Sequence, residues 1–139
     1  MAKKQIVVMG GGGFLSEGKR SRLDAYVLAQ ARRAKPRICF LPTASGDAQT
    51  SIKRFLRAFP PTRAEASVLS LFHRDGRDIE ARLLSQDIIY VGGGNTANML
   101  AVWRVHGVDK MLRKCWTSGV ILTGVSAGML CWFESSCTD

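Results

Sequence analysis

Three glycine-rich turns, each placed directly after a short apolar run, constrain the fold of this 139-residue chain more than any other feature. The apolar runs are QIVVM, DIIYV and VILTGV, and the turns cover residues 10–13, 92–95 and 124–128. The runs lack the alternation of apolar and polar residues that marks a half-exposed strand, which indicates strands buried on both faces. A helical pattern follows each of the first two turns. This order is typical of a parallel β-sheet with helices on both faces.

The periodicity of the apolar residues predicts the individual elements. Strands are expected over residues 5–9, 37–41, 67–72, 87–91 and 120–125. Helices are expected over 16–34, over a segment with the apolar face Ile52, Phe55, Leu56 and Phe59, and over 79–84, 97–105 and 109–116. In the first helix, Ser16 is the expected N-cap, and Leu23, Val27 and Ala31 share one face. The length suits one core, so residues 1–139 are expected to form a single α/β domain.

The formal net charge of +9 raises the question of a nucleic-acid partner. The basic residues cluster at the ends and on the polar faces of predicted helices, and no aromatic residues alternate with them to stack bases. This distribution favours solvated surfaces over a nucleic-acid interface.

Other classes of protein and site are disfavoured by simple counts. No apolar run reaches the roughly 18 residues that span a bilayer, and the apolar run near the N-terminus is too short for a signal peptide. A cytoplasmic location without membrane attachment is therefore expected. The four cysteines, Cys39, Cys115, Cys131 and Cys137, lack metal-ligand spacing and are expected to be reduced thiols.

The turn after the last predicted strand carries the strongest chemical signal. Gly124-Val125-Ser126-Ala127-Gly128 fits the GxSxG pattern, in which a sharp turn from strand to helix presents the serine hydroxyl above a sheet. The flanking glycines remove side chains that would clash in the turn. The N–H group of Ala127 would then face an oxyanion formed at the serine. The alternative is a tight turn that merely tolerates serine.

The turn over residues 92–95 allows two interpretations. It precedes a predicted helix and could cradle a phosphate, but it lacks the Lys-Ser/Thr pair of a P-loop. An oxyanion or substrate-binding role for Gly93, Gly94 and Asn95, beside the serine turn, fits better.

The turn over residues 10–13 resembles the start of a dinucleotide-binding loop. Leu15 occupies the position where that motif needs glycine, and no acidic residue ends the second predicted strand to bind a ribose. The dinucleotide interpretation is therefore disfavoured.

Four segments, VVMGGGGF, CFLPTAS, YVGGGNTANML and GVSAGMLCWFE, resemble in order and spacing the peptidase E (aspartyl dipeptidase) family of serine peptidases, to which cyanophycinase is more distantly related. The resemblance covers essentially the whole chain. It implies a fold like that of class I glutamine amidotransferases, with serine in place of cysteine, and hydrolysis of dipeptides with N-terminal aspartate. It also implies Ser126 as nucleophile and the Ala127 and Gly94 N–H groups as oxyanion donors. No metal or organic cofactor is implied, and the oligomeric state, including a homodimer, stays open.

The chain departs from this family in its histidines. Members are longer and carry the catalytic histidine well after the serine, whereas His73 and His106 match no family motif. We therefore expect a C-terminally incomplete fold, the N-terminal part of a longer catalytic domain, which is inactive alone. The arginine that binds the substrate carboxylate in the family is also expected beyond Asp139.

The family places the acid of the triad shortly after the serine. Asp139, in the context Cys-Thr-Asp, is the first candidate and Glu134 the second. If a regular helix continued from Ser126, Glu134 would lie about 12 Å along its axis, too far to orient a histidine at the serine. Two alternative functions remain open: another serine hydrolase or amidotransferase-like enzyme, and a truncated binding or subunit module without catalysis.

Overall fold

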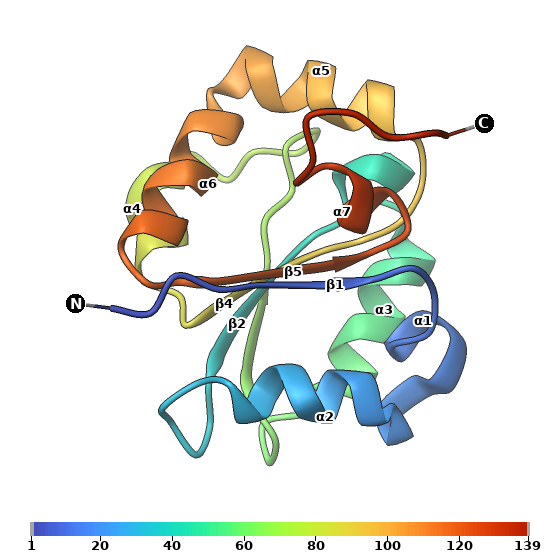
Figure 1. Cartoon of the computed structure of the whole chain (residues 1–139), viewed down its shortest axis with the longest axis vertical. Helices are drawn as coiled ribbons and strands as arrows, with labels where there is room; N and C mark the ends of the chain where they lie inside the picture. Colours follow the sequence, from blue (N-terminus) through green and yellow to red (C-terminus); the bar gives the residue numbers. More distant parts are fainter. Residues whose placement is uncertain (1, 139) are drawn as a thin grey trace.

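A five-stranded parallel sheet organises the computed structural model, which describes residues 2–138 (Figure 1). The strand order is β1-β5-β4-β2-β3, and all neighbouring strands are parallel. The strands are β1 (Ile6–Met9), β2 (Arg37–Leu41), β3 (Glu65–Val68), β4 (Ile88–Val91) and β5 (Ile121–Val125). The predicted α/β fold with a parallel sheet is confirmed. The order places β5 between β1 and β4, so the three strands that precede the glycine-rich turns are neighbours.

Helices cover both faces of the sheet (Figure 1). On one face lie α1 (Phe14–Glu17), α2 (Arg22–Ala29) and α3 (Gln49–Ala58). On the other lie α4 (Ile79–Leu84), α5 (Thr96–His106), α6 (Val108–Thr117) and α7 (Ala127–Leu130). Within residues 2–138, no helix combines the length and the apolar character that crossing a membrane requires.

Each face of the sheet has its own apolar core, because successive strand residues point to opposite faces. In β2, Ile38 and Phe40 pack towards α1–α3, whereas Cys39 and Leu41 pack towards α4–α7. The first core contains a cluster of aromatic rings, Phe14, Phe40, Phe55, Phe59 and Tyr90. Burial of β4, and of β2 after Arg37, on both faces explains their continuous apolar sequences. The expected burial of the first strand on both faces is wrong, because β1 lies at the edge of the sheet and leaves Ile6 39% and Val8 40% exposed.

The predicted helix over residues 16–34 is wrong in its extent. Gly18 adopts a φ of 60°, which ends α1 after one turn, and a short 3-10 helix over Gly18–Arg20 precedes α2. The N-cap of α2 is Ser21, whose Oγ accepts a hydrogen bond from the Asp24 N–H, and not Ser16. Leu23 is 41% exposed, so of the three predicted face residues only Val27 is a buried residue of α2. The apolar spacing predicts one continuous helix, but the positive φ of Gly18 interrupts it.

Two further predictions differ from the structure on the β3 side. The third strand covers residues 65–68 and not 67–72, because the Leu71 and Phe72 N–H groups donate to the Asp47 carboxylate instead of to a neighbouring strand. In α3, Phe55 is buried as expected, but Leu56 is 44% exposed. The apolar face of α3 is therefore narrower than the spacing predicts.

Candidate active site

The carboxyl ends of β1, β4 and β5 bring the three glycine-rich turns together. The Ser126 N–H donates to the carbonyl oxygen of Met9, at the end of β1, over 3.1 Å. A pocket of about 430 Å³ opens beside Ser126. It is lined by Gly10, Gly94, Asn95, Thr96, Ser126, Ala127, Met129, Leu130, Cys137 and Thr138. Ligands of parallel α/β sheets bind at this edge of the sheet, so the pocket is the candidate site.

Ser126 occupies a constrained turn between β5 and α7. Its φ of 57° and ψ of −118° are unusual for a residue with a side chain; among residues 2–138 only Asp47 also combines a side chain with a positive φ. Every residue of β5 is buried, whereas Ser126 itself is exposed. The backbone therefore turns sharply at the point where the side chain reaches solvent. A strained backbone of this kind persists only where the surrounding structure enforces it.

Close backbone packing at Gly124 and Gly128 holds the serine turn in this conformation. A Cβ atom at Gly128 would clash with the carbonyl group of Val91 and lie 3.0 Å from the Gly92 oxygen. A Cβ atom at Gly124 would clash with the Gly128 carbonyl and lie 2.8 Å from the Val91 oxygen. These obstacles are backbone atoms of β4 and α7 and cannot rotate away. The two glycines let α7 pack directly onto the end of β4.

Gly128→Ala should therefore lower the free energy of unfolding by about 3 kcal/mol, at the upper end of the effects of overpacking. The measurement is a denaturant titration followed by circular dichroism. Gly11→Ala is the matched control, since a Cβ atom there meets nothing within 4 Å. Equal stability of the two variants would show that the turn can relax around the new methyl group.

The backbone around Ser126 comes from α7 and from the 92–94 loop. Ser126 O accepts hydrogen bonds from Met129 and Leu130, and within residues 2–138 the Ala127 N–H donates to no protein acceptor. A Cβ atom at Gly93 would lie 3.3 Å from Ser126 Cβ, which places the loop over residues 92–94 directly beside the serine. The serine turn and the 92–94 loop are therefore in direct contact, and the Ala127 N–H, next to the serine in the chain, is not used by an acceptor among the described residues.

The loop over residues 92–94 is held by the loop after β2. Gly94 has a φ of 142°, and a Cβ atom there would clash with the carbonyl group of Ala44. The same Ala44 oxygen accepts a hydrogen bond of 2.8 Å from the Asn95 N–H. The Asn95 side-chain oxygen is the N-cap of α5 and accepts a hydrogen bond of 2.8 Å from the Asn98 N–H. This oxygen therefore stabilises the helix, whereas the sequence predicted a substrate-binding role for Asn95.

The segment after Ser126 corrects one assumption about the acid. α7 ends at Leu130, so the regular helix assumed from Ser126 to Glu134 is wrong, and the chain turns back towards its end (Figure 1). Glu134 is exposed and is absent from the pocket lining, whereas Cys137 and Thr138 line the pocket. Asp139, the first candidate, lies outside the described residues.

Neither His73 nor His106 lines the pocket. His73 follows β3, which is separated from β5 by three strand spacings of about 4.8 Å each, or about 14 Å. α5 starts at Thr96 beside the pocket, and His106 ends it about 15 Å away. The described part of the chain thus brings no imidazole to Ser126.

Several pocket residues were not expected from the sequence. Thr96 is only 7% exposed, and its hydroxyl has no hydrogen-bond partner among the described residues. Its position directly after Asn95 in the GGGNT turn was the available signal. Cys137 and Thr138 entered the sequence analysis only as the context of Asp139, and their own place in the pocket lining was not expected.

Comparisons with known proteins agree with this architecture. Residues 6–139 match the sequence model described as Peptidase family S51. The uncharacterized peptidase YgaJ of Bacillus subtilis (strain 168) is 51% identical over 136 residues, which are 98% of this chain and 59% of that protein. This chain therefore spans about three-fifths of the length of the curated relative that it matches.

Two solved structures share the fold at low sequence identity. A putative peptidase E protein from Listeria monocytogenes EGD-e has a TM-score of 0.70 at 20% identity, with 91% of this chain and 60% of that chain covered. A peptidase from an acI-B1 Actinobacterium has a TM-score of 0.65 at 21% identity, with 90% and 55% covered. The match of residues 6–139 to the family model and the relative at 51% identity show that the chain belongs to peptidase family S51.

Proposed function

We propose that this chain forms the nucleophile-bearing part of a serine peptidase that hydrolyses dipeptides with N-terminal aspartate. The observation that carries the proposal is the placement of Ser126 in a constrained, exposed turn that contacts the 92–94 loop and is followed by the Ala127 N–H, which donates to no acceptor among residues 2–138. Membership of peptidase family S51 supports peptide hydrolysis. The preference for aspartate comes from the sequence resemblance to peptidase E.

In the proposed mechanism, a histidine from outside the described residues takes the proton of the Ser126 hydroxyl. Oγ attacks the peptide carbonyl carbon, and the Gly94 and Ala127 N–H groups donate to the resulting oxyanion. The tetrahedral intermediate collapses as the histidine returns the proton to the leaving amine. Water, deprotonated by the same histidine, then releases the acyl group from Ser126.

The described lining of the pocket also limits how substrate charge is recognised. Among residues 2–138, the pocket residues are glycine, alanine, methionine, leucine, asparagine, threonine, serine and cysteine, without a cationic side chain. A substrate carboxylate needs a cation or several N–H donors for tight binding. We therefore place the group that binds the aspartate side chain outside the described residues, as we do the histidine.

Substrate profiling of the full-length protein tests the proposal. Asp-X dipeptides should be cleaved at least about 100-fold more efficiently than Ala-X dipeptides, since a site built for a carboxylate is left unpaired by alanine. A folded polypeptide of residues 1–139, checked by circular dichroism, should cleave neither because it lacks the histidine.

Two outcomes contradict the proposal. Faster turnover of an activated ester or of glutamine than of any dipeptide would favour an esterase or amidotransferase-like enzyme. Dipeptide turnover by residues 1–139 alone would return His73 and His106 to consideration as general base.

A further inference from the structure

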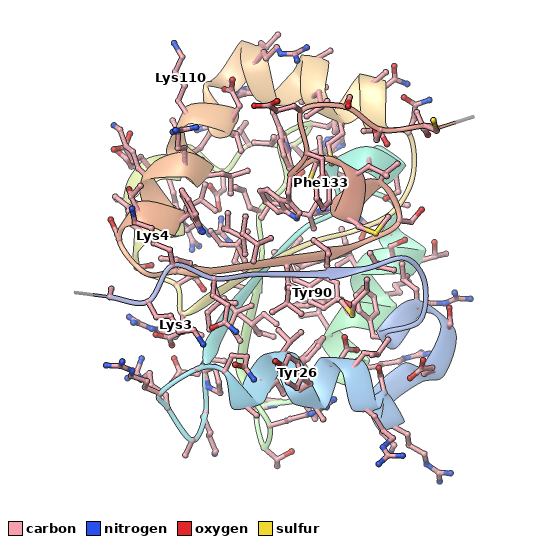
Figure 2. The ribbon with its side chains drawn as sticks, viewed as in Figure 1. Lys3, Lys4, Tyr26, Tyr90, Lys110 and Phe133 are labelled. Atoms are coloured by element: carbon pink, nitrogen blue, oxygen red, sulfur yellow. The ribbon has the colours of Figure 1, made fainter. Side chains whose placement is uncertain are left out.

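The buried carboxyl group of Asp24 takes no part in the serine chemistry. Asp24 lies in the first turn of α2 with 0% of its surface exposed. Its Oδ1 accepts a hydrogen bond of 2.9 Å from the hydroxyl of Tyr90, which is also fully buried. Figure 2 shows Tyr90 between the sheet and α2. Among the described residues, Asp24 Oδ2 has no hydrogen-bond partner.

Burial raises the pKa of Asp24 from 3.8 to about 6. The charged and polar groups that face it are Tyr90 of β4, Arg63 before β3 and the Phe14 N–H, which lower the pKa, and Glu17 of α1, which raises it. Because the native pKa lies above the unfolded value, protonated Asp24 stabilises the fold, and this contribution is lost as the pH rises through about 6. At neutral pH the ionised carboxylate therefore destabilises the native state.

The glycine loop over residues 10–13 rests on the Asp24–Tyr90 pair. Gly13 has a φ of 68°, and a Cβ atom there would lie 2.6 Å from the Tyr90 hydroxyl oxygen and 3.3 Å from Asp24 Oδ1. The Gly13 carbonyl oxygen accepts from the Glu17 N–H at 2.9 Å, which starts α1. The Asp24–Tyr90 pair therefore packs against Gly13 at the end of the loop, and α1 follows directly.

The same loop reaches the serine at its other end. Gly10 lines the Ser126 pocket, and the preceding residue, Met9, accepts the hydrogen bond from the Ser126 N–H. Tyr90 also directly precedes Val91, whose carbonyl group packs against Gly128. The Asp24–Tyr90 pair therefore contacts one of the segments that support the serine turn, the 10–13 loop, and through Tyr90 belongs to the other, the end of β4.

From these contacts we propose that Asp24 is a positioning residue for the Ser126 site: its carboxylate fixes Tyr90, and the pair holds the 10–13 loop and the end of β4 beside the serine. The proposal rests on the proposed peptidase function. A buried group that destabilises the fold at neutral pH while ordering a pocket is an exchange of stability for activity.

Asp24→Asn in the full-length protein is the test, because the amide keeps the shape and an oxygen acceptor for Tyr90 but does not ionise. The Tyr90 hydroxyl then donates to a neutral oxygen instead of to a carboxylate, and this hydrogen bond is weaker. Because the pair then holds the serine turn less firmly, we expect kcat at about pH 8 to fall about 10-fold or more, with KM nearly unchanged. The folding equilibrium constant of the variant relative to the wild type should rise more than about 10-fold between about pH 4.5 and about pH 8. Denaturant titrations at the two pH values measure this ratio.

Two further variants serve as controls. Asp109→Asn makes the same substitution at an exposed position in the first turn of α6 and should change neither kcat nor the pH dependence of stability. Tyr90→Phe keeps the ring and removes the hydroxyl donor. It should lower kcat as Asp24→Asn does, but it should lower stability at about pH 8, because the ionised carboxylate loses its hydrogen bond.

Wild-type kcat in Asp24→Asn overturns the proposal, and so does a lowered kcat without the change of relative stability with pH. The rate at which a phosphonylating reagent labels Ser126 distinguishes a failure of the positioning role of Asp24 from a failure of the proposed peptidase function. If the wild type is labelled and Asp24→Asn is labelled equally fast, only the positioning role is overturned. If the wild type neither cleaves peptides nor is labelled, the proposed function fails and the positioning role with it.

Discussion

Replacing Ser126 with alanine in the full-length protein should lower kcat by about 10⁶-fold and leave KM nearly unchanged. The serine acts through the bond that Oγ forms with the substrate carbonyl, so its removal eliminates the covalent pathway and little of the binding. The variant should fold normally, because Ser126 is exposed and alanine leaves no buried polar group unpaired. Steady-state kinetics on an Asp-X dipeptide and a thermal melt measure the two effects.

The matched control for this prediction is Ser118→Ala, which removes an exposed serine near the opposite end of β5. It should retain wild-type kcat. A phosphonylating reagent should label Ser126 once in the wild type and not at all in Ser126→Ala. Near-full activity of Ser126→Ala would show that the turn has only a structural role and would contradict the proposed serine peptidase function.

Asp139→Asn should lower kcat by about 10⁴-fold, the scale expected when the acid of a triad loses its charge. Two neighbours of Asp139 in the chain, Cys137 and Thr138, line the Ser126 pocket, whereas Glu134 does not. Glu134→Gln should therefore change kcat by less than about 10-fold and serves as the comparison in the same assay. The reverse ranking would identify Glu134 as the acid and would require the segment after α7 to lie differently.

Four of the five strands of the described sheet and the glycine turns were predictable because each depends on local sequence, whereas the third strand was placed wrongly. Buried parallel strands need continuous apolar runs, and the turns around Ser126 and Gly94 need glycine where backbone atoms approach closely. The adjacency of β1 and β5 was not predictable, since the two strands are separated by most of the chain. The pocket at Ser126 depends on that adjacency.

The errors also have local physical causes. Apolar spacing does not register a single glycine with positive φ, so the break at Gly18 was missed. The early end of α7 was missed because the apolar residues after Ser126 continue the helical pattern. Asp24 lies where an acidic residue ordinarily interacts with a helix N-terminus at the surface, so its burial against Tyr90 had no signal in the sequence.

The contact between Gly94 and the Ala44 carbonyl has a consequence for redesign of this protein. Insertions or deletions close to Ala44 would move the 92–94 amides along with it, so a library aimed at new substrates would lose activity there whatever its side chains. The exposed segment over residues 73–77 follows β3 at the edge of the sheet and makes no such contact. Length variation is better tolerated on exposed loops of this kind, which makes this segment the better place to graft new recognition elements.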